Sequence, residues 1–421
     1  MALRVSFVSL GCRVNRVEID AIVSELRRNG CELVREREAD AIVVNTCAVT
    51  GEAEAKTRKA LRHAAGLPQK PLVVATGCVA TLNAAELEEL ADNVVVETDK
   101  SRVARRVLDE LQVAGGATDA VDFGSVTSTG RTRPGIKIQD GCDLRCTYCI
   151  VWKARGASRS VAVDEVVRQV SEACEQGASE VVLTGINLGR YRDDSTGATV
   201  LLPGLLETLL ERVDVGRLRL GSIEPQDVNE ALVEVMATSQ GRIAPFLHMC
   251  LQSGCDETLR RMGRVYDTAL FAERVALARE RLGHVSFGTD LIVGFPGETD
   301  EEFERSLAFC ERMRFSHMHV FRYSKRPGTP AATMEGQVSP LVSAARMQKA
   351  LALSERLRLS EAQALLGAHD RVVVQAEGRG VTGGLFDALL DPAVPVDSLV
   401  DVQVKEVRDD ASLVCELTPG H

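Results

Sequence analysis

One short loop constrains this chain more than any other feature, because it carries three cysteines at Cys-x3-Cys-x2-Cys spacing. Cys142, Cys146 and Cys149 follow an apolar segment, residues 136–138, that is typical of a β-strand. Three thiolates on one loop can hold three irons of a [4Fe–4S] cube and leave the fourth iron open to a small molecule. The alternative is a zinc loop or a group of reduced thiols. Structural zinc sites use four closed ligands, and the sequence has no fourth Cys or His near this loop.

The first part of the chain alternates between strand and helix patterns, which is typical of a parallel sheet covered by helices. The predicted strands cover residues 5–10, 41–45, 72–76 and 93–97, and the predicted helices cover residues 18–29, 52–65, 84–90 and 101–111.

A second set of cysteines follows three of these predicted strands. Cys12, Cys47 and Cys78 each come shortly after a strand end. Because ligands of open parallel sheets bind outside the carboxyl ends of the strands, the three thiols are expected to meet at one edge and bind one cofactor. The alternative is that they are three small buried hydrophobic residues.

The rest of the chain predicts a second αβ series and a β-rich end. Six predicted strands, at residues 135–139, 180–185, 217–223, 246–251, 285–293 and 317–323, favour a partial (β/α)6 barrel with its chemistry at the carboxyl ends of the strands. A long helix over residues 340–366 and a small β-barrel over residues 370–417 are expected to follow. The fold class is therefore α/β, with predicted domains at residues 1–114 and 134–366, a linker at 115–133, and a β domain at 367–421.

Composition narrows the functional classes. A net charge of −10 argues against a general polyanion binder, because nonspecific nucleic-acid affinity comes from neutralising phosphates. Twelve cysteines in a chain of this length do not form a small secreted disulfide framework. Neither a signal peptide nor a membrane span is expected from the sequence. A reduced, cytoplasmic location is the natural expectation, with thiols used for metal binding or catalysis.

The Cys142 loop resembles the signature of the radical S-adenosylmethionine (SAM) enzymes, and the two cysteine triads together resemble those of the radical-SAM methylthiotransferases. That family has an N-terminal domain with three cysteines, a central radical-SAM barrel and a C-terminal β-barrel called TRAM. The matching motifs here are Leu-Gly-Cys-Arg-Val-Asn at 10–15, Val-Asn-Thr-Cys-Ala-Val-Thr at 44–50, Thr-Gly-Cys at 76–78, Ala-Arg-Gly at 154–156, Leu-Thr-Gly-Ile-Asn-Leu-Gly at 183–189, Leu-Gln-Ser-Gly at 251–254, Thr-Asp-Leu-Ile-Val-Gly-Phe-Pro-Gly-Glu at 289–298 and Tyr-Ser-Lys-Arg-Pro-Gly-Thr at 323–329.

The resemblance implies two clusters and two molecules of SAM per turnover. Cys12, Cys47 and Cys78 would ligate an auxiliary [4Fe–4S] cluster, where one SAM methylates a sulfur. The second SAM would be cleaved at the Cys142/Cys146/Cys149 cluster, and its radical would abstract hydrogen from an unactivated carbon that then takes the methylthio group. An electron-donor protein and a sulfur source are the implied partners, together with the anticodon loop of a tRNA.

The residues that follow Cys12 bear on the substrate. Arg13, Val14 and Asn15 most resemble the branch that acts at C2 of N6-threonylcarbamoyladenosine, at position 37 beside the tRNA anticodon. Isopentenyladenosine in tRNA and an aspartate of a ribosomal protein are the alternative substrates of the family. A non-enzymatic iron–sulfur, RNA-binding protein with a decayed SAM site is the alternative outside it, although the intact Cys triad and the Gly-Phe-Pro-Gly-Glu strand end speak against decay.

Further site residues are expected from position in the barrel. The predicted SAM contacts are Tyr148, Gly185, Asn187, Glu224, Gln252, Gly294, Phe295 and Pro296, although each glycine is equally typical of a tight turn. The predicted substrate contacts are Lys153, Arg155, Arg322, Lys325 and Arg326. Lys153 and Arg155 are candidates to bind the threonyl carboxylate by a charge-assisted bond.

The chain also departs from the family pattern. Trp152-Lys153, Met249-Cys250 and Cys255 stand where the family usually has other residues. From residue 370 to the end, ten Asp and Glu stand against four Lys and Arg, a net charge of −6, which is unfavourable for contact with tRNA phosphates.

Overall fold

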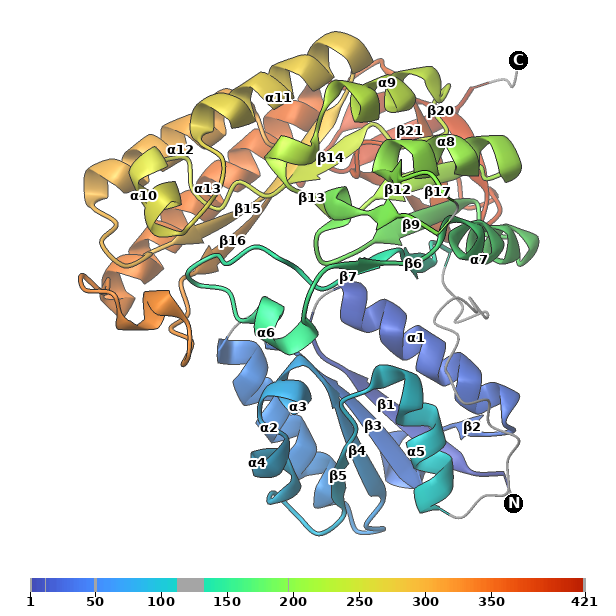
Figure 1. The fold of residues 1–421 in the computed structure, drawn as a ribbon. Helices are drawn as coiled ribbons and strands as arrows, with labels where there is room; N and C mark the ends of the chain where they lie inside the picture. The colour runs from blue at the N-terminus through green and yellow to red at the C-terminus, as the bar shows by residue number, and fades with distance from the viewer. Residues whose placement is uncertain (1, 12, 49–50, 112–131, 196, 419–421) are drawn as a thin grey trace.

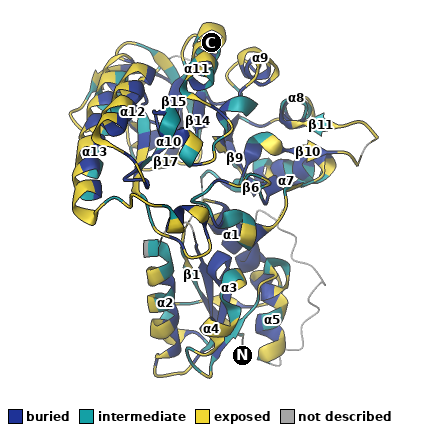
Figure 2. Ribbon diagram, turned by 60° about the vertical axis from the view of Figure 1, so that its left-hand side comes forward, coloured by how far each residue is buried: buried dark blue, intermediate teal, exposed yellow. Residues whose placement is uncertain are grey.

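The computed structural model describes residues 2–11, 13–48, 51–111, 132–195 and 197–418. Within these ranges the chain forms three modules in sequence order: a parallel sheet covered by helices, a larger parallel barrel, and a small closed β-barrel (Figure 1). Buried residues concentrate in the strands and on the inward faces of the helices (Figure 2). Among the described residues, no helix has the length and apolarity needed to cross a membrane.

The N-terminal sheet has the strand order β2-β1-β3-β4-β5, and every pair is parallel. Its strands are β1 (Arg4–Ser9), β2 (Glu32–Leu33), β3 (Ala41–Thr46), β4 (Leu72–Gly77) and β5 (Val94–Val96). Its helices are α1 (Arg13–Arg28), α2 (Gly51–Ala65), α3 (Cys78–Leu82), α4 (Ala84–Glu88) and α5 (Val103–Glu110), with 3-10 turns η1 (Glu36–Glu38) and η2 (Lys100–Arg102). Ile42 and Val44 pack with α2, whereas Val43 packs with α1. The central strands β3 and β4 are buried along almost their whole length because both faces are covered.

The middle module continues with parallel strands in the orders β6-β9-β12 and β13-β14-β15-β16, and only Gly221 separates β12 from β13. The strands are β6 (Gly135–Lys137), β9 (Glu180–Thr184), β12 (Arg217–Leu220), β13 (Ser222–Ile223), β14 (Phe246–Met249), β15 (Ser286–Val293) and β16 (His317–Arg322). The helices that pack against them are α7 (Val163–Glu175), α8 (Leu202–Arg212), α9 (Glu230–Thr238), α11 (Thr268–Leu282), α12 (Asp300–Met313) and α13 (Pro340–Gln363). The smaller elements are β7 (Gln139–Asp140), β8 (Arg159–Ser160), β10 (Arg192–Asp193), β11 (Val200–Leu201), α6 (Val151–Arg155), α10 (Asp256–Arg261), η3 (Leu188–Arg190), η4 (Pro225–Asp227) and η5 (Pro330–Thr333).

The C-terminal module is a closed barrel in the order β17-β18-β19-β21-β20. Its strands are β17 (His369–Ala376), β18 (Arg379–Val381), β19 (Asp387–Leu389), β20 (Leu399–Val407) and β21 (Leu413–Leu417). The expected fold class, with an open parallel sheet, a partial six-unit barrel and a small β-barrel, is thereby confirmed. The domain boundaries remain predictions, and most of the expected linker lies outside the described residues. The two-residue β2 and the short α3 were not expected, since neither is long enough to leave a periodic pattern.

A buried ion cluster ties the middle barrel to the C-terminal one. In β12, Leu218 packs in the core while the neighbouring arginines face the other way. Nε of Arg219 donates to Oε1 of Glu180 at 2.8 Å, and its Nη1 donates to the carbonyl of Gly383 at 2.9 Å. Arg217 pairs with the same carboxylate and donates to the carbonyl of Val381 at 3.2 Å. Burial acts to raise the pKa of Glu180, but the two arginines outweigh it and hold the pKa at about 2.

Removing this carboxylate should destabilise the protein and change its response to acid. Glu180→Gln leaves two buried guanidinium groups without their counter-charge, so we expect a loss of about 3–5 kcal/mol of unfolding free energy. The folded pKa lies below the ordinary 4.5, so the contribution of Glu180 is complete above pH 4.5 and is lost as pH falls toward 2. The gap between wild type and variant in urea unfolding should therefore shrink across that window.

Glu311→Gln is the matched control, because Glu311 pairs with Arg356 on the surface with both side chains more than half exposed. Its stability should be close to that of the wild type at every pH. Equal stability losses for the two variants would contradict the interpretation of Glu180 as a buried anchor.

Candidate functional site

The auxiliary cysteines lie at one edge of the N-terminal sheet. Ser9 pairs in register with Asn45, and Asn45 pairs with Thr76, so β1, β3 and β4 end side by side. Cys47 directly follows β3 and is 1% exposed, while Cys78 begins α3 after β4 and is 4% exposed. The structure therefore brings Cys47 and Cys78 to the expected edge. Cys12, the third predicted ligand, lies outside the described residues.

Two glycines give the backbone room at this edge. Gly11 has φ +99°, and a Cβ there would lie 2.3 Å from both Cβ and Sγ of Cys47. Gly77 has φ +96°, and a Cβ there would lie 2.4 Å from Oδ1 of Asn45. Any side chain at either position would collide with the groups that carry or support a thiol. The glycines beside Cys12 and Cys78 are therefore required by space and by backbone conformation.

The loop of the other triad is fixed by its neighbours in the barrel. Nε2 of Gln139 donates to the carbonyls of Asp140 and Gly141, both at 2.9 Å, and its Oε1 accepts from the backbone N–H of Asn187 at 2.7 Å. The backbone N–H of Cys142 donates to the carbonyl of Gly156 at 3.1 Å. These contacts set the three thiols at the carboxyl end of the first barrel strand, as the sequence predicts.

Hydrogen-bond donors surround the three sulfurs. Nη1 of Arg264 lies 3.1 Å from Sγ of Cys146, Nδ2 of Asn187 lies 3.9 Å from Sγ of Cys142, and the backbone N–H of Val151 lies 3.4 Å from Sγ of Cys149. Burial raises the pKa of the Cys149 thiol to about 11. Because bound metal deprotonates a coordinating thiol outright, donors placed at the sulfurs suit thiolates on a metal better than neutral thiols.

Arg264 was missed by the sequence analysis. Its Nη2 pairs with Glu224, its Nε donates to the Tyr266 hydroxyl at 3.0 Å, and its Nη1 approaches the Tyr148 hydroxyl at 3.4 Å. Burial raises the pKa of Glu224. This set joins the cysteine loop to the ends of the third and fourth barrel strands. The sequence shows only an arginine after a Met-Gly turn, which gives no signal of this position.

The other predicted SAM contacts lie at the carboxyl ends of the barrel strands. A Cβ on Gly185 would come 3.0 Å from Gln139, so the glycine permits close approach there. Gln252 has φ +66° and pairs with Leu291 of β15 through an isolated bridge. The segment after β15 is also buried: the backbone N–H of Gly294 donates to Glu298 at 2.7 Å, and Phe295 meets Tyr148 edge to face at 6.3 Å between ring centroids. Pro296 is buried beside them.

The two cysteine sites are joined by residues 323–329, the loop after β16. The backbone N–H of Gly51, at the start of α2, donates to Oγ of Ser324 at 2.9 Å, and Nζ of Lys153, in α6, donates to the carbonyl of Gly328 at 2.6 Å. Arg326 in this loop is 4% exposed, and among the described residues its Nη2 has no hydrogen-bond partner. Burial lowers the pKa of Arg326, while Glu54, Cys47, Cys149 and Cys78 attract the cation and act against that shift. Arg326 therefore lies between the two cysteine sites.

The structure argues against a substrate contact by Arg155. The residue is 8% exposed. Its Nη1 donates to Glu18 and to Asp140, both at 2.9 Å, and its Nη2 donates to Oδ1 of Asn15 at 2.6 Å. A guanidinium with these partners is committed to the contact between α1 and α6, because a charge once paired in the interior is costly to release. Of the other basic residues predicted to bind substrate, Lys153, Arg322 and Lys325 are exposed.

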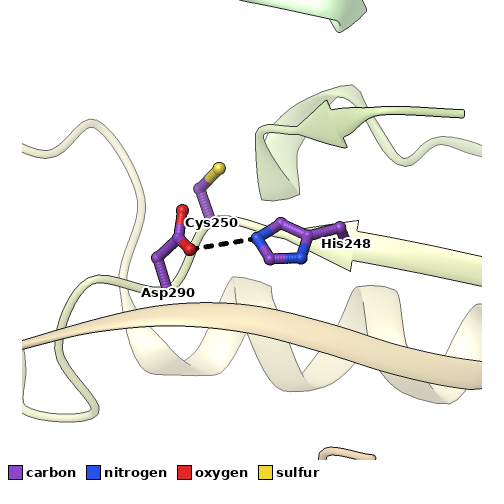
Figure 3. A group of neighbouring side chains, drawn as sticks. All are labelled: His248, Cys250 and Asp290. Atoms are coloured by element: carbon purple, nitrogen blue, oxygen red, sulfur yellow. Dashed lines mark ion pairs between the residues drawn. The ribbon is translucent and has the colours of Figure 1, made fainter. Parts of the chain in front are cut away.

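A polar group that the sequence analysis did not assign lies farther along β14, β15 and β16 (Figure 3). Nε2 of His248 lies 3.3 Å from Oδ1 of Asp290. Nδ1 of His319, which the figure does not draw, lies 3.2 Å from the same oxygen. Burial acts to raise the pKa of Asp290, but the two histidines outweigh it and hold the pKa well below its usual range. Cys250 completes the group, since its sulfur lies within 4.8 Å of the His248 and Asp290 ligand atoms.

Comparison with known proteins identifies the family. The chain matches the Radical SAM superfamily over residues 136–310 and the uncharacterized protein family UPF0004 over residues 4–97. It is 37% identical to the threonylcarbamoyladenosine tRNA methylthiotransferase MtaB of Bacillus subtilis (strain 168), over 84% of this chain and 80% of that protein. The protein of the same name from Aquifex aeolicus is 33% identical, over 96% of this chain and 100% of that protein. The chain belongs to the radical-SAM methylthiotransferase family.

Other relatives mark a second branch and the shared fold. The ribosomal protein uS12 methylthiotransferase RimO of Anaeromyxobacter sp. (strain Fw109-5) is 36% identical, over 89% of this chain and 82% of that protein. Among solved structures, the radical SAM methyltransferase TsrM from Kitasatospora setae, with cobalamin and a [4Fe-4S] cluster bound, superposes with a TM-score of 0.55 at 16% identity, covering 79% of this chain and 77% of that one. That likeness shows the fold alone.

As a radical-SAM methylthiotransferase, this chain is an enzyme whose cofactors are [4Fe–4S] clusters and SAM. The donor groups of the structure fit these cofactors: one triad lies on a single loop with hydrogen-bond donors at its sulfurs, and two described thiols lie at the edge of a sheet. The assignment of individual cysteines to each cluster remains a prediction.

The two triads should hold separate clusters. After reconstitution the wild type should bind about eight irons per chain, four per cube. Replacing Cys142, Cys146 and Cys149 by Ala should leave about four irons and abolish production of 5′-deoxyadenosine from SAM. Iron analysis and product chromatography measure the two quantities.

Cys310→Ala is the control, because this thiol is fully buried in the barrel core and distant in sequence from both triads. It should retain both clusters. A full iron complement in the triple variant would contradict the assignment of the triads.

Proposed function

We propose that this enzyme inserts a methylthio group at C2 of N6-threonylcarbamoyladenosine at position 37 of tRNA. The observation that supports this most strongly is the match to relatives named for that substrate, at 33% to 37% identity over most of both chains. The Arg-Val-Asn segment after Cys12 agrees with it, and Asn15 has a defined task. Its Nδ2 donates to the carbonyls of Leu10 and Thr46, both at 2.9 Å, and so fixes the two loops that carry cysteines.

The chemistry explains the need for two cysteine sites. An aromatic C–H bond has no useful acidity, so acid–base catalysis cannot break it. When bound, the clusters and SAM supply a carbon-centred radical and a methylthio donor. The chain's own residues position the two sites: α3 packs against α6, and residues 323–329 contact both modules. Placement of the sulfur within reach of the target carbon supplies the proximity that the transfer needs.

Substrate access is proposed at the exposed basic residues around this junction. Lys153, Arg322 and Lys325 are exposed there. Trp152 adds an aromatic face, with the Arg145 guanidinium 4.3 Å and the Lys153 ammonium 5.2 Å from its ring centroid. Aromatic rings and cations of this kind stack unpaired bases and contact phosphates. The base must leave its stack, which costs least in a single-stranded loop.

The partners and the location complete the proposal. Cleavage of SAM consumes electrons and methylthio transfer consumes sulfur, so an electron-donor protein and a sulfur source must serve the enzyme. A cytoplasmic location agrees with twelve cysteines in a chain that uses thiols as metal ligands.

A second candidate function is methylthiolation of a ribosomal-protein aspartate. Two observations favour it: relatives named RimO match at 31% to 36% identity, and the C-terminal module is acidic. An acidic surface would repel tRNA phosphates but could face the basic surface of a ribosomal protein. The Arg-Val-Asn segment after Cys12, together with an identity of 37% to one tRNA-modifying relative against at most 36% to the RimO relatives, makes this the second choice.

The substrate assignment predicts a clear order of preference in a purified system. Reconstituted enzyme with SAM and a reductant should convert tRNA carrying threonylcarbamoyladenosine to its 2-methylthio form. Under the same conditions, tRNA carrying isopentenyladenosine and isolated ribosomal protein S12 should give at least tenfold less product. Mass spectrometry of digested nucleosides and peptides measures all three.

The variant lacking Cys47 and Cys78 is the matched control, since it should still cleave SAM yet form no methylthio product from any substrate. Preferential conversion of the ribosomal protein would replace this proposal with the second candidate.

A further inference from the structure

The group formed by His248, Cys250 and Asp290 lies on the inner side of the barrel. Along β14, Leu247 and Met249 pack in the hydrophobic core, so His248 between them faces the opposite side, as alternation along a strand requires. Asp290 comes from the neighbouring strand β15, and Figure 3 shows its carboxylate and the imidazole turned toward one another beneath the Cys250 side chain. Three different donor types therefore lie within 4.8 Å of one another in the barrel interior.

One distance within the group matches that of two ligands on a common ion. Ligands about 2.0–2.1 Å from a tetrahedral zinc lie roughly 3.3 Å from each other, and Nε2 of His248 lies 3.3 Å from Oδ1 of Asp290. The three donor atoms all lie within 4.8 Å of one another. His248 is 8% exposed, and among the described residues its Nε2 has no hydrogen-bond partner. Its contact with Oδ1 of Asp290 is the ion pair drawn in Figure 3, so a metal ion bound by both groups would take the place of that pair.

We propose that His248, Cys250 and Asp290 bind a divalent transition metal of borderline softness, with Zn²⁺ as the best match. Imidazole nitrogen, thiolate sulfur and carboxylate oxygen are the three ligand types that zinc accepts together. His319 contacts the same carboxylate from β16 at 3.2 Å and fixes its orientation, as residues behind a metal ligand commonly do. Three protein ligands leave one tetrahedral position open, the arrangement of zinc sites that bind substrate.

A second group of similar composition, Cys255, Glu257 and Glu302, does not qualify. Sγ of Cys255 donates to Glu257 at 3.0 Å, and Glu302 is paired with Arg261. Its potential ligands are therefore satisfied by one another and by a cation of the protein. This group provides an internal control, because it holds a cysteine and two carboxylates at a similar spacing but no imidazole.

The group lies close to the radical-SAM cysteine loop. Cys250 lies near enough to Cys146, Glu224 and Arg264 to interact with their charges. A zinc ion here would take an oxygen donor, and the threonyl carboxylate of the modified adenosine is one. This role rests on the proposed function. It supplies the cation that the sequence analysis sought in Arg155, whose charge is committed to Glu18 and Asp140.

The test uses the holoenzyme with both clusters assembled and one equivalent of added Zn²⁺. After removal of loose metal, about one zinc per chain should remain, with the iron content unchanged. Zinc K-edge X-ray absorption, which is separate from the iron edge, should report one sulfur at about 2.3 Å and nitrogen or oxygen neighbours at about 2.0–2.1 Å. Cys250→Ala should lose the sulfur neighbour and most of the zinc, while Cys255→Ser should change neither.

Two outcomes would overturn the site: zinc bound without a sulfur neighbour, or zinc retained equally by Cys250→Ala. Iron content shows that each variant has folded and loaded its clusters. In a second arm, Cys250→Ala should raise the KM for tRNA carrying threonylcarbamoyladenosine at least tenfold. An unchanged KM would rule out a role of the zinc in binding the threonyl carboxylate. The zinc K-edge measurement shows whether the metal site exists, and it does so even if that tRNA is not the substrate.

Discussion

The carboxylate of Glu18 is the point on which the arrangement of this enzyme depends. It is completely buried in α1, and it binds Lys100 of the N-terminal module together with Lys137 and Arg155 of the barrel. Burial acts to raise the pKa of Glu18, but the three cations outweigh it and hold the pKa well below its usual value. Removal of one partner from such a group leaves uncompensated charge in the interior, so the network resists separation of the two modules. The auxiliary edge and the radical-SAM loop are thereby held face to face.

The same network has an electrostatic consequence for the cysteines. Its cations exceed its carboxylates, and both Lys100 and Arg155 interact with Cys78. Arg326 adds a buried cation that Cys47, Cys78 and Cys149 attract. Thiolates and the clusters that they hold carry negative charge, so excess positive charge at this junction stabilises the loaded state. A chain of net charge −10 thus concentrates cations where its anionic chemistry takes place.

Sequence reasoning recovered the parts of this structure that leave local patterns. The six barrel strands and the helices of the N-terminal sheet follow from apolar periodicity, and Cys47, Cys78 and the Cys142 loop follow from their place after strands. It did not recover Arg264 beside Cys146, or His248 facing Asp290, because these contacts join residues from different strands and loops. Arg155 also shows that contacts between residues distant in sequence cannot be read from a local pattern. A basic residue after the cysteine loop resembles a substrate contact until its partner Glu18, distant in sequence, is placed beside it.

The proposed activity of this enzyme, with its two cysteine sites held together, is methylthiolation of threonylcarbamoyladenosine in tRNA. The most direct measurement is mass spectrometry of tRNA nucleosides from cells that lack this protein, compared with the same cells carrying the intact gene. In the cells that lack the protein, the 2-methylthio form should disappear and threonylcarbamoyladenosine without the methylthio group should accumulate in its place. An unchanged level of the 2-methylthio nucleoside, in cells that make no other enzyme of this branch, would contradict it.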